Sequence, residues 1–438
     1  MGLSADLDDA HDLHALVGVI EEGEVAHLHR PHEIAGLVVA HTFPGLALAP
    51  LGEARNDDRT SRAKGTARMR TPLCDLLGID VPILQSGMGN VAAPDLVAAV
   101  SQAGGLGIAG GLGLSRDDLR NRIRQVRQLT DRPFGVNMWL HTALRPPADV
   151  AGIPEAAIGA VQGALNGMRR DLGLAPSAGR PAPVPDYINE AFEVILEERV
   201  PVWSIGLGDP GPEMVKRCRE RKIKVIAMVA TVEDGRAVAR SGVDAIVAQG
   251  GEAGGHRSTW IKRGDREEAA IGTLALVPQL VDAVSVPIIA AGGIVDGRGL
   301  VAALALGASG VLLGTRFVAT RESKAPAMYK DALLRSGADA TTLSDSFTGL
   351  YARVLRNRYT TDYAASGAPV LPPLVQSNAA EDIKAKAVET NNPDYYALYA
   401  GQGVGLIDDL PGAGDVVQSI MREASAVLGR LASDTGPK

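Results

Sequence analysis

Short, mostly apolar runs recur along the chain from Val81 onward, and most of them end at or next to a glycine or a polar residue. Between residues 81 and 314 there are eight: "VPILQ" (81–85), "LGIA" (106–109), "PFGVNM" (133–138), "PVWSIG" (201–206), "KVIAMV" (224–229), "DAIVAQ" (244–249), "PIIAAG" (287–292) and "GVLLG" (310–314). Continuous rather than alternating apolarity is typical of strands that are covered on both faces, as in parallel sheets. The runs therefore predict eight buried parallel strands.

Helix signals fill the intervals between these strands. Pro94 is placed as a first-turn proline, Ser115 with Asp118 resembles a capping box, and Thr231 can cap the segment that follows it. Eight strands with seven connections over 234 residues (81–314) match a TIM barrel in count and size. A six-stranded doubly wound sheet would leave two strands over. The pattern predicts an α/β protein built on a TIM (β/α)8 barrel.

Two segments exceed what such a barrel needs. Residues 141–200 join the third and fourth predicted strands, and residues 323–399 follow the eighth. Long connections after barrel strands lie on the active-site face. We therefore expect a barrel over 69–322 with an insertion at 141–200, a helical substrate or lid domain over 323–399, and a helical return to the barrel over 400–438. One or both long segments should cover a substrate pocket.

The first 68 residues differ from the rest. They hold six of the eight histidines, and the stretch 53–70 is polar and charged like a solvated linker. We expect a poorly ordered N-terminal extension, or a chain whose translation begins at Met69. The run "HLHRPH" (27–32) could instead hold a metal ion, but no cysteine or acidic partner stands at ligand spacing. No metal site is therefore predicted.

Composition narrows the functional class. The net charge is −7 and aromatic residues make up 4%, with no basic stripe, which argues against nucleic-acid binding. No run of 18 apolar residues suggests a membrane span, and the acidic start lacks the regions of a signal peptide. The two cysteines, Cys74 and Cys218, lie in no metal or redox spacing. A cytoplasmic enzyme acting on a small molecule is the expectation.

Glycines mark the ends of several predicted strands. "GGLGIAGG" (104–111) contains GxGxxG at Gly105, Gly107 and Gly110, but a dinucleotide site needs that motif between a strand and a helix. Here it follows a helix, so we interpret it as the second barrel strand and its exit loop. The Rossmann interpretation is the alternative.

The last two strands end in "AAGGI" (290–294) and "LLGTRF" (312–317). Barrels often bind phosphate with the loops after strands seven and eight, where backbone N–H groups and a helix N-terminus face the anion. Charge-assisted hydrogen bonds of about 1.5–3 kcal/mol each would hold a phosphate-bearing cofactor without a lysine. The alternative is tight strand-to-helix packing through small residues.

A histidine follows the sixth strand in "AQGGEAGGHRS" (248–258). Gln249 can hydrogen-bond a polar ring edge, and the glycines allow close approach of a ligand. His256 and His141 are the only histidines in the barrel region. A neutral imidazole can take a proton from a carbon acid, which typically contributes about 100- to 10,000-fold in rate. A purely structural histidine is the alternative.

These motifs, together with "PILQSGMGN" (82–90), "YARVLRN" (351–357) and "YAGQGVGLIDDLPGAGDVV" (399–417), resemble the nitronate monooxygenases, formerly called 2-nitropropane dioxygenases. The resemblance covers about residues 69–430 and implies an FMN-containing TIM barrel with a smaller, mainly helical second domain. It implies His256 as the catalytic base. The residues that it places around FMN fall into three groups: Ser86, Gly87, Met88, Asn137 and Gln249 at the flavin ring; Gly254 and Gly255 approaching from the sixth loop; and Gly292, Gly293, Leu313, Gly314 and Thr315 at the phosphate.

The implied reaction is oxidation of alkyl nitronates, or of nitroalkanes deprotonated by His256, by O₂ to a carbonyl compound and nitrite. The partners would be that substrate and O₂, and a homo-oligomer stays open. Alternatives on the same barrel are an NAD(P)H:quinone reductase and a flavin-dependent enoyl-thioester reductase. From another class, the chain could be a non-catalytic barrel that binds a phosphate ligand. "QSGM" (85–88) stands where many relatives have "QAPM", and the insertion 141–200 is long for a small bacterial member.

Overall fold

The computed structural model describes residues 69–259 and 270–434. All of them belong to one compact unit, residues 64–438. The expectations for the first 68 residues, including the "HLHRPH" alternative, fall outside the described residues.

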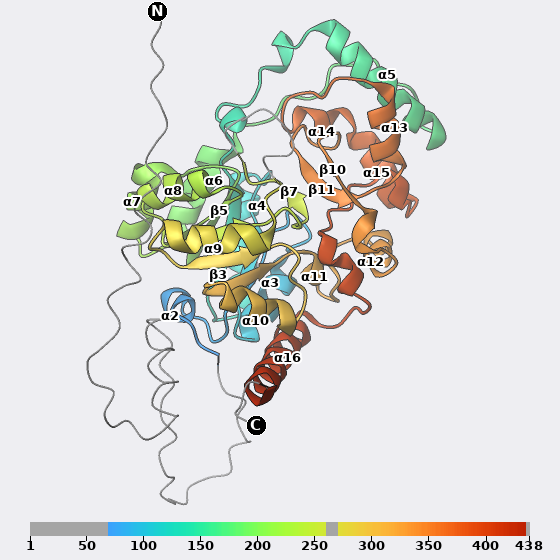
Figure 1. Cartoon of the computed structure of the whole chain (residues 1–438). Helices are drawn as coiled ribbons and strands as arrows, with labels where there is room; N and C mark the ends of the chain where they lie inside the picture. The colour runs from blue at the N-terminus through green and yellow to red at the C-terminus, as the bar shows by residue number, and fades with distance from the viewer. Residues whose placement is uncertain (1–68, 260–269, 435–438) are drawn as a thin grey trace, which may run out of the picture. The chain divides into compact units, whose positions relative to one another are not determined.

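Eight parallel strands form a closed barrel, drawn at the centre of Figure 1. Their order in the sheet is β1-β9-β8-β6-β5-β4-β3-β2, and a parallel bridge between Leu84 and Leu106 joins the two ends. The predicted TIM barrel is confirmed. The barrel strands are β1 (Ile83–Gln85), β2 (Gly107–Gly110), β3 (Phe134–Trp139), β4 (Val202–Gly206), β5 (Lys224–Val229), β6 (Ala245–Gln249), β8 (Ile288–Ala291) and β9 (Gly310–Leu313).

The helices around the barrel begin where the sequence signals place them. Pro94 occupies the first turn of its helix, the Ser115 hydroxyl accepts a hydrogen bond from the Asp118 N–H at 3.2 Å, and Thr231 accepts from Asp234 at 3.1 Å. Each such cap satisfies one N–H that the helix itself leaves unpaired. The helices are α3 (Pro94–Gln102), α4 (Arg116–Leu129), α6 (Tyr187–Glu197), α7 (Gly211–Glu220), α8 (Val232–Arg240), α9 (Thr273–Ala283), α10 (Gly297–Ala305) and the short α11 (Thr315–Val318).

Two hydrophobic layers hold the barrel together, because side chains alternate between the two faces of each strand. The strand side chains that point outward pack against the helices. This layer includes Trp203, Ile83, Ile246 and Val311. The inner layer is closed by α2 (Pro72–Leu77), whose leucines join it. The strand residues of the inner layer are Leu84, Ile108, Val202, Ile226, Ala245, Val247, Ile289, Ala291 and Leu312. Both faces are apolar, which is why the strands appear as continuous runs.

Residues 323–399, which we call the second domain for brevity although they belong to the same compact unit as the barrel, are mainly helical and also contain a small sheet. Strand β10 (Thr341–Ser344) pairs antiparallel with β11 (Ala352–Leu355), and β11 pairs with the two-residue strand β7 (Gly255–His256) from the barrel's sixth loop. The sequence analysis did not predict this sheet. The helices of the second domain are α12 (Ala327–Leu334), α13 (Arg358–Ser366), α14 (Val375–Ala379) and α15 (Glu381–Glu389).

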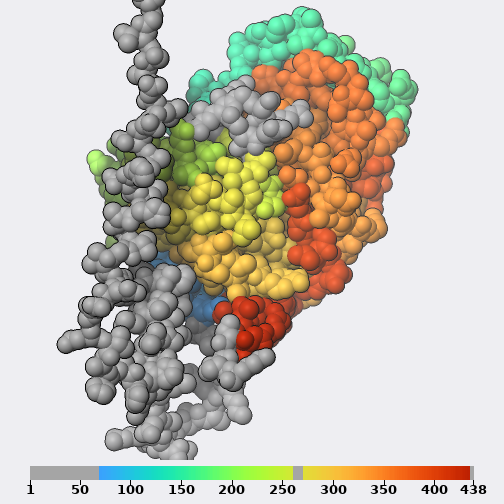
Figure 2. Space-filling view, in the orientation of Figure 1, coloured from blue at the N-terminus to red at the C-terminus, as the bar shows by residue number. Residues whose placement is uncertain are grey.

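The insertion 141–200 has two parts: its first part packs against the second domain, and α6 at its end packs on the barrel against α4 and β3. In the first part, helix α5 (Glu155–Asp171) contacts α13, and the surfaces of the two segments adjoin in Figure 2. The buried Arg169 side chain donates to the Asp382 carboxylate at 2.7 Å and to the Ala379 carbonyl at 2.8 Å. A buried guanidinium needs this full set of acceptors. Arg169 thus fixes the start of α15 to the insertion.

The chain returns to the barrel through α16 (Ala413–Asp434), which packs against α10 and α3. The Glu423 carboxylate accepts the Gly297 N–H at 3.0 Å, and Asp296 caps the next two N–H groups of α10. The N-terminus of α10 is therefore already satisfied by carboxylates of the chain. Within the described ranges, no helix combines the length and apolarity that crossing a membrane requires.

Candidate active site

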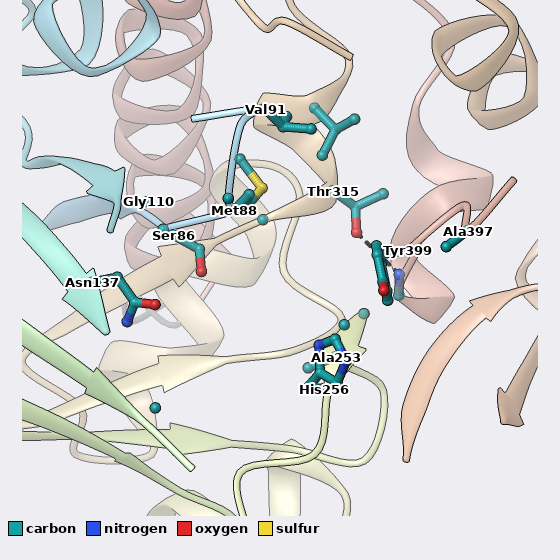
Figure 3. Close-up of a pocket in the computed structure, with 18 of the residues that line it drawn as sticks. Ser86, Met88, Val91, Gly110, Asn137, Ala253, His256, Thr315, Ala397 and Tyr399 are labelled. Atoms are coloured by element: carbon teal, nitrogen blue, oxygen red, sulfur yellow. Dashed lines mark hydrogen bonds between the residues drawn. The ribbon is translucent and has the colours of Figure 1, made fainter. Parts of the chain in front are cut away.

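A cavity of about 530 Å³ lies at the carboxyl ends of the barrel strands (Figure 3). All thirteen residues that the sequence analysis selected line it. They are Ser86, Gly87, Met88, Asn137, Gln249, Gly254, Gly255, His256, Gly292, Gly293, Leu313, Gly314 and Thr315. None of the described residues in the cavity wall comes from 141–200, whereas the second domain contributes many. Of the two long segments, 323–399 therefore covers the pocket.

The ends of β1, β3 and β9 form one side of the cavity. The Ser86 N–H donates to the Leu313 carbonyl at 2.9 Å, and a Cβ on Gly87 would lie only 2.3 Å from the Asn137 Cβ. The Asn137 amide nitrogen donates to the Ser204 hydroxyl at 3.1 Å. This bond leaves the amide oxygen as the polar atom that Asn137 can offer to a ligand.

The glycines of the sixth loop are required mainly by the chain itself. A Cβ on Gly254 would lie 2.5 Å from the Gly401 backbone nitrogen, and Gly255 has a φ of +80°. The Gln402 N–H donates to the Glu252 carbonyl at 2.9 Å in the same contact. The close approach at Gly254 is therefore between two segments of backbone, which bring the C-terminal segment into the cavity wall.

Gly314 is different, because no contact with the described residues requires a glycine there. Its φ is −106°, and an added Cβ would meet only the Met88 sulfur at 3.8 Å and the Ser86 Cβ at 3.9 Å. The missing side chain leaves open space in the cavity wall. The choice of glycine at position 314 is therefore explained better by the space that a ligand needs than by packing within the protein.

Backbone donors gather around this space. The N–H groups of Gly292, Gly293, Gly314 and Thr315 have no acceptor among the described residues. The Thr315 hydroxyl accepts the Gly401 N–H at 3.0 Å, a bond drawn in Figure 3, so its own proton is available to another acceptor. Unsatisfied donors around a glycine-lined space are the chemistry that binds an anion.

His256 is held by its backbone on two sides. In β7 it pairs with Ala352 of β11, and the following N–H, of Arg257, donates to the Tyr351 carbonyl at 2.8 Å. On the barrel side, the buried Arg257 guanidinium donates to the Gly250 carbonyl at 2.9 Å. Burial lowers the pKa of Arg257 to about 10, with a further lowering by Arg353, so the group stays charged at neutral pH. The histidine loop is therefore a rigid part of the wall.

Gln249 contributes to the same fixation. Its amide nitrogen donates to the His256 carbonyl at 2.8 Å, and its amide oxygen accepts the Ser258 N–H at 2.8 Å. The Ser258 hydroxyl donates to the Met228 carbonyl at 2.7 Å and accepts the Leu207 N–H at 2.9 Å. The sequence analysis placed Gln249 at a flavin ring edge, and both polar atoms of its amide already have backbone partners. Its clear structural role is to fix the histidine loop.

The His256 ring lies among three side chains. Its Nε2 is 2.8 Å from the Thr348 hydroxyl oxygen, and its ring centroid is 4.4 Å from that of Trp139 and 5.2 Å from that of Tyr399. Figure 3 shows the His256 and Tyr399 rings close together. No hydrogen bond to Nδ1 is found among the described residues. One ring nitrogen is thus held by Thr348 of the second domain, and the other has no partner in the part of the chain that the structure describes.

Sequence reasoning missed these three neighbours. Trp139 directly follows the third predicted strand, so its position at a strand end was an available signal. Tyr399 lies within a motif that the sequence analysis quoted without a role. Thr348 lies in "SDSFTG" (344–349), a polar stretch that looks like any turn, so no local signal marks it.

Burial lowers the pKa of His256 from 6.5 to about 3, and the nearby His141 adds a smaller lowering. The imidazole is therefore uncharged at neutral pH and has a lone pair available. The unfolded chain binds this proton near pH 6.5, but the folded chain binds it only near pH 3. Folded-state stability should therefore fall as the pH drops through this window.

This linkage predicts a difference between the protein and its His256→Asn variant. The free energy of unfolding should fall less in the variant between about pH 7 and pH 5, because asparagine takes up no proton. Urea denaturation of both flavin-free proteins at the two pH values measures the difference. Equal losses would mean that His256 titrates normally in the folded state.

The charges in the cavity wall are of one sign. Lys324 and Lys384 line it, and no aspartate or glutamate is found among its described residues, although the whole chain has 51 acidic and 44 basic residues. Lys324 pairs with Asp95 at 3.0 Å. Lys384 stands on the exposed side of α15, beside Val388. Such a wall favours anionic ligands over cationic ones.

Barrel enzymes bind their substrates at the carboxyl ends of the strands, in the loops that follow them. The cavity, its free backbone donors and the uncharged histidine all lie at that end. Fold and site together therefore define a TIM-barrel enzyme.

Comparison with known proteins identifies which kind. The chain belongs to the nitronate monooxygenase family, whose model matches residues 70–423, and it is an oxidoreductase. A nitronate monooxygenase of Pseudomonas aeruginosa is 40% identical over 352 residues, which are 80% of this chain and 97% of the relative. The solved structure of nitroalkane oxidase from Streptomyces ansochromogenes is 35% identical, with a TM-score of 0.73, over 82% of this chain and 99% of that one. The solved structure of FabK from Thermotoga maritima is 32% identical, with a TM-score of 0.66, over 83% of this chain and 99% of that one.

Proposed function

We propose that the protein binds FMN in this cavity and oxidises alkyl nitronates with O₂, giving a carbonyl compound and nitrite. We further propose that it accepts neutral nitroalkanes through proton abstraction by His256. The observation that carries the proposal is the open space at Gly314, which lies among unsatisfied backbone donors and which no packing requirement explains.

The residues present fit the cofactor. Gly292, Gly293, Gly314 and Thr315 offer backbone N–H groups and one hydroxyl, which is a suitable donor set for a phosphate dianion. Beside this donor set, the strand ends at Ser86–Met88 and the Asn137 amide oxygen offer a polar edge for a flat heterocycle; the Met88 sulfur and the Ser86 Cβ lie 3.8 and 3.9 Å from a Cβ placed on Gly314. When bound, FMN would supply the redox chemistry between the nitronate and O₂.

His256 supplies the proton chemistry of the proposal. A nitroalkane is a carbon acid, and an uncharged imidazole with a free nitrogen can accept its α-proton. The product pair is an imidazolium and a nitronate anion, and the opposite charges stabilise each other. The absence of carboxylates from the described wall supports the same assignment, because a carboxylate would repel the nitronate.

The second domain supports the proposal by enclosing the reaction. Tyr399, Phe347 and Tyr396 line the cavity on that side, and burial keeps the pKa of Tyr399 well above its usual value, so its hydroxyl stays neutral. An apolar aromatic wall excludes water from the neighbourhood of the histidine. It therefore keeps the abstracted proton from exchanging freely with solvent.

One experiment separates the proposal from its alternatives. The purified protein, saturated with FMN, is mixed with propyl nitronate while O₂ consumption and nitrite release are followed; we expect both. In parallel, anaerobic mixing with NADH is followed in the visible spectrum. Fast bleaching by NADH, with no O₂ consumption on the nitronate, would favour the quinone reductase or the enoyl-thioester reductase. A protein that takes up no FMN would favour the non-catalytic barrel.

A further inference from the structure

We propose that Thr348 is a positioning residue that fixes the tautomer of His256, so that Nε2 carries the proton and Nδ1 is the basic atom. This inference rests on the proposed function, in which His256 abstracts the proton. It adds a residue of the second domain to a site whose base is carried by the barrel.

The partners of the Thr348 hydroxyl favour one direction of the hydrogen bonds over the other. The Thr348 hydroxyl lies 2.8 Å from His256 Nε2 and 3.4 Å from the Leu350 carbonyl oxygen. A carbonyl oxygen can only accept, so the Thr348 hydroxyl must be the donor in the contact with Leu350. Its single proton is then used, and the hydroxyl oxygen offers the imidazole only a lone pair. In this arrangement Nε2–H donates to Thr348, and Thr348 donates to Leu350.

The opposite arrangement satisfies fewer groups. If the Thr348 hydroxyl donated to Nε2, the ring proton would move to Nδ1, which has no acceptor among the described residues. The Leu350 carbonyl, which belongs to a mostly buried residue, would lose this donor. Buried polar groups without partners are costly, so the first arrangement is the stable one.

No other described side chain can perform this role. Trp139 and Tyr399 contact the imidazole through their ring faces and edges and make no hydrogen bond with it. They restrict where the ring lies, but both tautomers have the same shape. In a histidine, the bond made by one ring nitrogen decides which one is protonated. Here that bond is the one to Thr348.

Thr348 is itself well anchored. It is largely buried, its carbonyl accepts the Leu374 N–H at 2.7 Å, and its N–H donates to Asp345 at 3.3 Å. Four residues further on, β11 pairs with the His256 backbone. The same stretch of the second domain thus holds both the backbone and the ring of the histidine.

The test compares Thr348→Val, which keeps the shape but removes the hydroxyl, with Thr348→Ser, which restores it. The direct measurement is ¹⁵N NMR of flavin-free protein labelled at histidine, with the His256 signals assigned from their loss in His256→Asn. In the unaltered protein and in Thr348→Ser, Nε2 should have the signature of a protonated nitrogen and Nδ1 that of a bare one. In Thr348→Val we expect a mixture of both tautomers.

The functional measurement is exchange of the α-hydrogen of nitroethane for deuterium, catalysed by FMN-loaded protein without O₂. Thr348→Val should lower this exchange by about 10-fold or more, because the reactive tautomer becomes less populated and the imidazolium that forms on proton abstraction loses the hydrogen bond from its Nε2–H to Thr348. Thr348→Ser should restore the exchange rate. In both variants the rate of oxidation of preformed nitronate should stay within about two-fold of that of the unaltered protein, because that substrate needs no base.

The outcomes are distinguishable. If His256→Asn exchanges as fast as the unaltered protein, the base assignment in the proposed function is wrong. If His256→Asn abolishes exchange but Thr348→Val leaves both exchange and the ¹⁵N spectrum unchanged, only the positioning role of Thr348 is wrong. Equal losses on nitroethane and on nitronate in Thr348→Val would likewise overturn it, by indicating a general structural defect.

Discussion

Replacing His256 with asparagine is expected to lower turnover of neutral nitroalkanes by about 100- to 10,000-fold, the usual contribution of a positioned base. Asparagine keeps a polar side chain of similar size but cannot take up a proton. Oxidation of the corresponding preformed nitronates should change little, because their proton is already gone. The measurement is kcat/KM by O₂ consumption, with nitroethane and ethyl nitronate compared on the same preparation.

His141 provides the matched control, since it is the other histidine of the barrel region. Its Nδ1 accepts the Ala143 N–H at 3.1 Å, and an asparagine oxygen can accept the same bond. In His141→Asn, kcat/KM for nitroethane and for ethyl nitronate should therefore stay within a few-fold of the values of the unaltered protein. A His256→Asn variant that still oxidises nitroethane at the original rate would show that the proton is removed elsewhere.

The second large effect is expected at Gly314. The φ of −106° at Gly314 lies outside the left-handed region that favours glycine, and the Cβ of a valine there would meet nothing closer than 3.8 Å. Its methyl groups would occupy the space that we assign to the phosphate. Loss of two charge-assisted hydrogen bonds should weaken FMN binding by about 100-fold or more. The Kd from flavin fluorescence titration, and the colour of the purified protein, measure this directly.

The control for this variant is the same replacement at Gly159. A Cβ at Gly159 meets nothing within 4 Å, and the residue lies on α5, far along the chain from any cavity residue. Gly159→Val should purify yellow with an unchanged Kd. Circular dichroism and melting temperature confirm that both variants are folded. If Gly314→Val binds FMN as tightly as the unaltered protein, the phosphate lies elsewhere.

The barrel could be predicted because its physics is local. Strands such as 224–229 are buried on both faces and therefore appear as continuous apolar runs, and caps such as Ser115 and Thr231 act within three residues of themselves. The site could be predicted in outline for a related reason. All parallel strands of a barrel end on one face, so polar and glycine residues at strand ends must gather there.

What could not be predicted depends on contacts between distant segments. Strands β10 and β11 have four residues each, and "TTLS" (341–344) has no marked alternation, so only their pairing defines them. Thr348 meets His256 across 92 positions of sequence. The position at which α5 packs depends on the contact between the buried Arg169 and Asp382, which lies more than 200 residues later in the chain. Neither composition nor periodicity contains such information.

For individual residues, the structure also shows contacts within the chain that the sequence did not suggest. Gly254 was expected to admit a flavin, and it is required by the backbone at Gly401. Gln249 was expected at a ring edge, and its amide is bound to the loop that follows it. In both cases the residue lines the predicted cavity, but the physical need for its type comes from elsewhere in the chain.

The pairing of β7 with β11 has a consequence for protein engineering. A chimera that exchanges residues 323–399 for the equivalent segment of a relative would replace the strand against which His256 is aligned, together with the hydroxyl group beside its ring. If His256 is the base, as we propose, substrate preference could not be transferred in this way without also changing the surroundings of that base. A safer design would graft only α14 and α15, leaving 341–355 with the barrel to which it is matched.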